Sequence, residues 1–81
     1  MDRQMVLDHL ALAERHIAEG KLIIDRQQTL IAELEQGGHD TTLSRELLSQ
    51  FLLTQTRHEE DRQRLRRELA KLHAERRRRL S

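Results

Sequence analysis

The chain has 81 residues, of which 36% are charged and 36% hydrophobic, and it contains one aromatic residue, Phe51, with neither proline nor cysteine. This length allows one domain, and the absence of cysteine excludes disulfides, zinc–thiolate sites and cysteine nucleophiles. Because good helix formers dominate and β-branched residues are few, the composition predicts an all-α fold.

The charges are unevenly distributed along the chain. Residues 1–40 carry 4 basic and 8 acidic side chains, whereas residues 41–81 carry 11 basic and 6 acidic ones. The opposite net charges favour two halves that lie side by side. The longest apolar run, residues 10–13, is far shorter than the roughly 20 residues that span a bilayer, and the start lacks the layout of a signal peptide. We therefore expect a cytoplasmic protein with no membrane partner.

The first half carries a heptad pattern. Apolar residues recur in alternating steps of three and four, which is typical of a helix and incompatible with a strand. This pattern predicts a helix from about residue 3 to residue 36. The positions of this first seam are Val6, Leu10, Ala13, Ile17, Gly20, Ile24, Gln27, Ile31 and Leu34.

Two adjacent glycines interrupt the pattern near the middle of the chain, in "GGHDTT" at residues 37–42. Gly37 is expected to take the left-handed conformation that ends a helix, and Gly38 lets the chain reverse. Asp40 or Thr41 then supplies a side-chain oxygen that caps a second helix. The sequence therefore predicts a turn at 37–40 between the arms of an antiparallel helical hairpin.

The second helix is expected from about residue 41 to residue 78. Its seam consists of Ser44, Leu48, Phe51, Gln55, His58, Arg62, Leu65, Leu69 and Leu72. In an antiparallel hairpin with this turn, facing residues have numbers that sum to about 78. The predicted apolar pairs are Val6 with Leu72, Leu10 with Leu69, and Ala13 with Leu65.

A second set of apolar residues lies outside the two seams. It consists of Met5, Leu7, Leu12, Leu22, Ile23, Leu30, Leu47, Leu52 and Leu53. A hairpin buries one stripe of each helix, and a chain this short is rarely stable alone. We therefore expect a homodimer that forms a four-helix bundle, and the alternative is a marginal monomer. The expected interface residues are Leu22, Ile23, Leu30, Leu47, Phe51 and Leu52, with Phe51 as the main anchor.

Several segments resemble a known group of proteins. "AERHIAEG", "ID.Q..LIAELE", "GHDTTLSRELL" and "F..TQ..H..DR.RLRREL" are similar to short uncharacterised proteins of rhizobial and related α-proteobacterial genomes. The resemblance covers about residues 8 to 70, and "GHDTT" is its most specific part. It implies a small bacterial cytoplasmic protein, and it implies no activity, cofactor or partner. The arginines at 76–79 lie outside the similar part.

The middle of the second seam is polar and consists of Gln55, His58 and Arg62. Buried polar groups need hydrogen-bonding partners. Such partners are expected among Glu14, Glu19 and Asp61. We expect these polar residues to fix the register of the helices, and the alternative is a pH-sensitive recognition site.

Five histidines raise the question of a metal site. Such a site needs three or four ligand atoms at about 2.0–2.2 Å from one ion. The expected register places Gly20 opposite His58 and leaves His16 about one helical turn from His58, which is too far for a shared ion. No metal or cofactor is therefore expected. The sequence also contains no glycine-rich phosphate loop and no serine placed with a His–Asp pair, so we expect no enzyme activity.

The C-terminal part of the second helix is strongly basic. Residues 62–79 contain nine Arg or Lys and two acidic residues, and they end in Arg76, Arg77, Arg78 and Arg79. Such clusters can neutralise phosphates of nucleic acids. Cations are also favoured at a helix C-terminus, and they can pair with an acidic neighbouring helix. We therefore expect a protein–protein interaction or regulatory adaptor with an unidentified protein partner, and the alternative is a nucleic-acid-associated protein.

Overall fold

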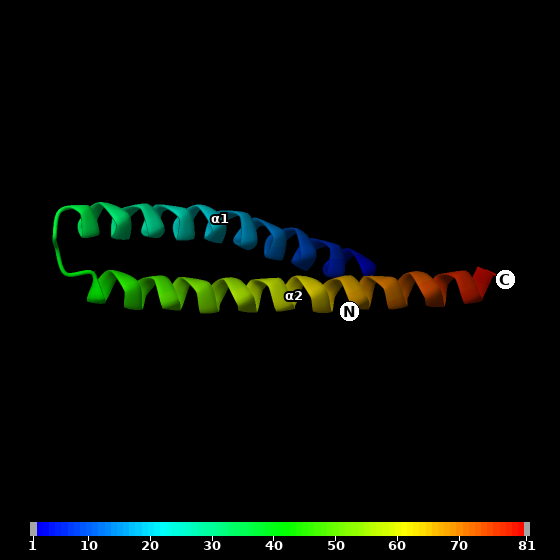
Figure 1. Ribbon diagram of the computed structural model, residues 1–81. Helices are drawn as coiled ribbons and strands as arrows, with labels where there is room; N and C mark the ends of the chain where they lie inside the picture. Colours follow the sequence, from blue (N-terminus) through cyan, green and yellow to red (C-terminus); the bar gives the residue numbers. More distant parts are fainter. Residues whose placement is uncertain (1, 81) are drawn as a thin grey trace.

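The computed structural model describes residues 2–80 and contains two antiparallel helices, α1 (Arg3–Gln36) and α2 (Thr42–Leu80), that form one long hairpin (Figure 1). The molecule measures 67 × 15 × 14 Å. The predicted all-α hairpin is confirmed. Within residues 2–80, neither helix has an apolar stretch long enough to cross a membrane.

The end of α1 is closed by the glycine pair. The amide of Gly38 donates to the carbonyl of Glu35, and the amide of His39 donates to the carbonyl of Leu34. These two bonds form a Schellman motif. Gly38 has the left-handed conformation, with φ of 72°, whereas Gly37 remains right-handed. The expectation that Gly37 is left-handed was therefore wrong, because Gly37 continues the helical geometry and the reversal falls on the next residue.

The start of α2 is capped by Asp40. Its Oδ1 accepts hydrogen bonds from the hydroxyl of Thr42 at 2.7 Å and from the amide of Thr42 at 3.0 Å. These two bonds, of which that from the hydroxyl has the larger effect, hold the pKa of the Asp40 carboxyl below its ordinary value. The carbonyl of Thr41 accepts the first helical bond, from Arg45. The predicted helix start is confirmed within one residue.

The two predicted seams form the contact between the helices. Every residue of both seams is buried or half-buried. The centre of the apolar core is Val6, Ala13 and Leu65, and Leu10, Leu69 and Leu72 pack around it. This apolar cluster lies at the end of the hairpin far from the turn, and Ile31 is a further buried apolar residue close to the turn.

Two buried glutamines fix the helices relative to each other. Nε2 of Gln27 on α1 donates to the carbonyl of Ser44 at 2.8 Å, and Nε2 of Gln55 on α2 donates to the carbonyl of Ile17 at 2.8 Å. Each amide crosses the seam to a main-chain oxygen of the opposite helix. One bond runs from α1 to α2 and the other from α2 to α1, and both fit the same alignment of the two helices. Together they oppose sliding of one helix along the other.

Candidate functional site

One flank of the hairpin is closed by ion pairs. Glu14 on α1 lies 3.5 Å from Arg66 on α2, and Glu35 on α1 pairs with Arg45 on α2 near the turn. Each of these four residues directly follows a seam residue, so all four lie on the same side of the hairpin. We call this side the closed flank. These four side chains form their ion pairs within one chain.

The opposite side carries apolar residues. Ile23 and Leu30 of α1 are each 42% exposed, and Leu47 of α2 is 45% exposed. Each directly precedes a seam residue, which places it on the side away from the ion pairs. We call this side, defined by Ile23, Leu30 and Leu47, the open flank. Exposed apolar area of this kind is unfavourable in water and marks an interaction surface.

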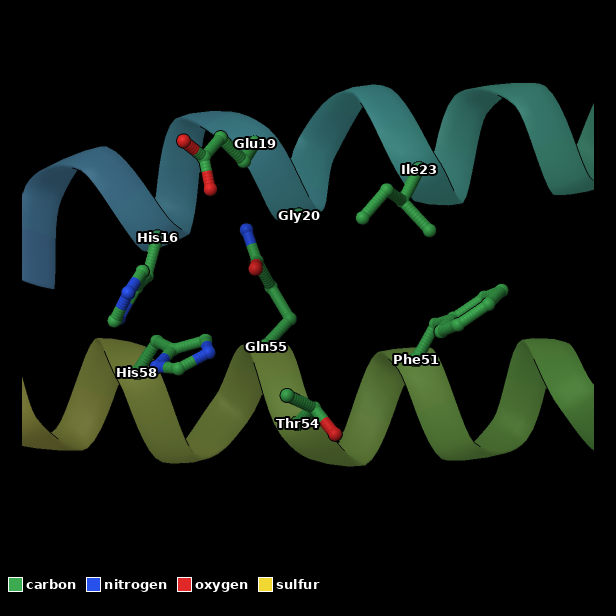
Figure 2. Close-up of a pocket in the computed structure, with 8 residues that line it drawn as sticks. All are labelled: His16, Glu19, Gly20, Ile23, Phe51, Thr54, Gln55 and His58. Atoms are coloured by element: carbon green, nitrogen blue, oxygen red, sulfur yellow. The ribbon is translucent and has the colours of Figure 1, made fainter.

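A pocket of about 130 Å³ opens beside these residues (Figure 2). Phe51 and Ile23 form its apolar part and reach into the space between the helices from α2 and α1. The other residues around it are His16, Glu19, Gly20, Thr54, Gln55 and His58. The open flank therefore combines an apolar part near the turn with a polar part near the middle of the hairpin.

Gly20 and Gln55 meet at the bottom of this pocket. A Cβ atom on Gly20 would lie 2.0 Å from Oε1 of Gln55 and 3.0 Å from its Cδ. Oε1 is buried and accepts no hydrogen bond. Its neighbour is the backbone of Gly20, where a Cα–H group can act as a weak donor. The amide can reach the carbonyl of Ile17 only because residue 20 has no side chain.

The sequence-based register was wrong at this point. It placed His58 opposite Gly20, but Gln55 occupies that position. It also separated His16 from His58, whereas their ring centres lie 4.8 Å apart with the planes tilted by 45°. The register had been counted from the turn, which fixes it only to about one helical turn. The long side chain of Gln55 fills the space at Gly20 and leaves His58 beside His16.

The expected acidic partners of the polar seam lie elsewhere. Glu14 pairs with Arg66, and Asp61 lies 3.4 Å from Arg64 on its own helix. Glu19 borders the pocket. Among residues 2–80, no group of three or more His, Asp or Glu side chains is arranged to hold a metal ion. Of the three polar seam residues, Gln55 has a clear register function, through its bond to Ile17.

The six expected interface residues fall on three sides of the hairpin. Ile23, Leu30, Leu47 and Phe51 belong to the open flank or border its pocket. Leu52 follows a seam residue and lies on the closed flank. Leu22, which is 57% exposed, lies on the outer side of α1. The sequence identified exposed apolar residues but did not separate these sides.

The four C-terminal arginines lie where α2 runs past the start of α1 (Figure 1). Nε of Arg3, at the start of α1, lies 3.4 Å from Nε2 of His73 on α2. Residues 76–79 follow further along α2 and are exposed. They are therefore far from the apolar part of the open flank.

Comparison of the chain with protein-family models, curated proteins and solved structures finds no match.

Proposed function

We propose that the protein is a small non-enzymatic adaptor that self-associates through the open flank and presents the resulting four-helix bundle to a protein partner. The observation that carries this proposal is the difference between the flanks. The closed flank carries two ion pairs between the helices and one exposed leucine, Leu52, whereas the open flank exposes Ile23, Leu30 and Leu47. The resemblance noted in the sequence adds a bacterial cytoplasmic setting to the proposal.

Self-association follows from the small core of the hairpin. The buried apolar residues of the described chain are Val6, Ala13, Ile31 and Leu65. Two helices with so little buried apolar area are marginal in water. A second copy on the open flank would bury its leucines and the pocket edge, as the faces of four-helix bundles do. The expected stabilisation comes from the hydrophobic effect.

Two adjacent residues provide a matched test of the open flank. Ile23→Asp places a charge in the proposed interface, whereas Leu22→Asp makes the same kind of change on the outer side of α1. We expect the wild type and Leu22→Asp to have twice the chain mass of 9.6 kDa by sedimentation equilibrium. Ile23→Asp should weaken the dimer by about 100-fold or more, because burial of an unpaired carboxylate costs several kcal/mol.

Circular dichroism serves as the control that the helices are retained. A wild type with the mass of one chain at all concentrations would contradict self-association. Equal effects of Ile23→Asp and Leu22→Asp would contradict the open flank as the interface. In a purification from native cells, a partner of the bundle should be captured by the wild type and by Leu22→Asp, and lost with Ile23→Asp.

A second candidate function, nucleic-acid association, is favoured by one observation. Arg76, Arg77, Arg78 and Arg79 lie together on the exposed end of α2. Phosphate contacts of this kind predict duplex DNA binding that weakens steeply with salt. Binding that disappears on truncation after Leu72 would support this function. Binding that persists in the truncated chain, or no binding at low salt, would exclude a role of these arginines.

A further inference from the structure

We infer that the second copy lies on the open flank in the same direction as the first, so that both turns are at the same end of the bundle and the two-fold axis runs along the hairpin. This inference rests on the proposed function. It specifies which residues of the two copies meet. It also distinguishes one bundle from the reversed arrangement, in which the turns lie at opposite ends.

The three residues that define the open flank, Ile23, Leu30 and Leu47, lie in the half of the hairpin nearer the turn, and Leu12 is an exposed leucine that borders the far half of the same flank. Leu30 and Leu47 lie within about one helical turn of the same height on α1 and α2, since both are close to the turn. A two-fold axis along the hairpin places Leu30 over Leu47 of the second copy, and Leu47 over Leu30 of the second copy. Four leucines then form one apolar layer, as in the core of a helix bundle.

The reversed arrangement brings different residues together. At the far end of the same flank, the positions equivalent to Leu30 and Leu47 are His9 and Glu68. A copy with the opposite direction would set the leucines of each chain against these polar side chains. Burial of an unpaired carboxylate such as that of Glu68 against leucine is unfavourable. The distribution of side chains therefore favours the same direction.

Charges at the rim support the same choice. Glu19 borders the pocket on α1, and Arg57 is exposed at a similar height on α2. Both directly precede seam residues and lie on the outer edge of the open flank. With both copies in the same direction, Glu19 of each chain approaches Arg57 of the other. The arrangement thus creates two symmetric ion pairs, in the way that flanking charges set partner orientation in coiled coils.

Spin labels on single cysteines test the direction. Because the chain has no cysteine, His39→Cys in the turn carries the only label of each chain, and Arg77→Cys provides a second variant at the other end of α2. The same direction predicts that the two labels of a dimer lie within about 25 Å at either site, since neighbouring helix axes are about 10 Å apart. The reversed arrangement separates the turn labels by roughly 50 Å, at 1.5 Å per helical residue.

The outcomes distinguish the inference from the proposed function. A dimer with short distances at both sites supports the inference. A dimer with a long distance at the turn overturns the inference and leaves self-association intact. A single-chain mass without dipolar coupling overturns the proposed function itself.

An exchange of charge between positions 19 and 57 tests whether Glu19 of one copy meets Arg57 of the other. Glu19→Arg and Arg57→Glu are each expected to weaken the dimer by about tenfold, because each reversal affects two symmetric pairs. The double variant should restore the wild-type dissociation constant. The matched control is the exchange Glu14→Arg with Arg66→Glu on the closed flank, which keeps its ion pair within the chain and should leave dimerisation unchanged. A double variant at 19 and 57 that stays as weak as the single variants would overturn the inference.

Discussion

Replacement of Leu65 with alanine is expected to lower the free energy of unfolding by about 2–4 kcal/mol, which is the usual range for a leucine in a packed core. Leu65 is 3% exposed and packs with Val6 and Ala13 at the centre of the core. Since these helices have few other buried apolar contacts, the neighbours can do little to fill the space. The loss is a large part of the stability of a small domain.

Urea unfolding followed by circular dichroism measures this effect, at one protein concentration for all variants because association shifts the apparent stability. The matched control is Leu53→Ala. Leu53 is 47% exposed on the outer side of α2, so its loss should cost less than about 1 kcal/mol. Similar losses for both variants would show that the core does not lie between Leu65 and its neighbours on α1.

The effect of Gly20→Ala on the free energy of unfolding is expected to change sign with the residue at position 55. In the wild type, the new Cβ would collide with Oε1 of Gln55, and the displaced amide would lose its bond to Ile17. Loss of a buried hydrogen bond costs about 1–3 kcal/mol, which outweighs the gain of about 1 kcal/mol in helix propensity. The variant should therefore be less stable than the wild type by about 1 kcal/mol.

A double-mutant cycle isolates this coupling. In the background Gln55→Ala, the obstacle is absent, and Gly20→Ala should stabilise the protein by about 1 kcal/mol through helix propensity. The coupling free energy between the two positions is then about 2 kcal/mol. Gly20→Ala with the same sign and size in both backgrounds would mean that Gln55 does not lie against Gly20.

The helical hairpin was predictable because the heptad spacing, the glycine pair and the capping aspartate all favour the same structure. The heptad spacing from Val6 to Leu34 identifies the buried stripe of α1, and all nine positions are buried or half-buried. The glycine pair and Asp40 identify the turn. Gly38 takes the left-handed conformation there, and Asp40 accepts a hydrogen bond from the amide of Thr42. Periodicity and capping are local properties, and they do not require knowledge of the opposite helix.

The centre of the hairpin was not predictable in the same way. Which residue faces Gly20 depends on the offset between the helices, and an error of one turn exchanges Gln55 for His58. Three-dimensional packing resolves the choice, because a long amide can both fill the space at Gly20 and reach the carbonyl of Ile17. A seam glycine combined with a seam glutamine on the other arm is the signal that could have indicated this pair.

The candidate site was predicted in composition but not in geometry. The sequence showed more apolar residues than a hairpin can bury, and all of this surplus except Leu7, which is half-buried, is exposed. It did not show that the ion pairs Glu14–Arg66 and Glu35–Arg45 occupy one flank only. That distinction separates Leu47 on the open flank from Leu52 on the closed flank. It requires the positions directly before and after each seam residue to be considered separately on both helices.

Methyl accessibility in the unmodified protein tests the central claim, that a second copy covers the open flank. In a single hairpin, Ile23, Leu30, Leu22 and Leu53 are all between 42% and 57% exposed, so a soluble paramagnetic agent would relax their methyl groups to a similar extent. In the proposed dimer, the methyl signals of Ile23 and Leu30 are protected, while those of Leu22 and Leu53 remain accessible. Similar relaxation of all four, at concentrations well above those used for the mass measurement, would contradict the account.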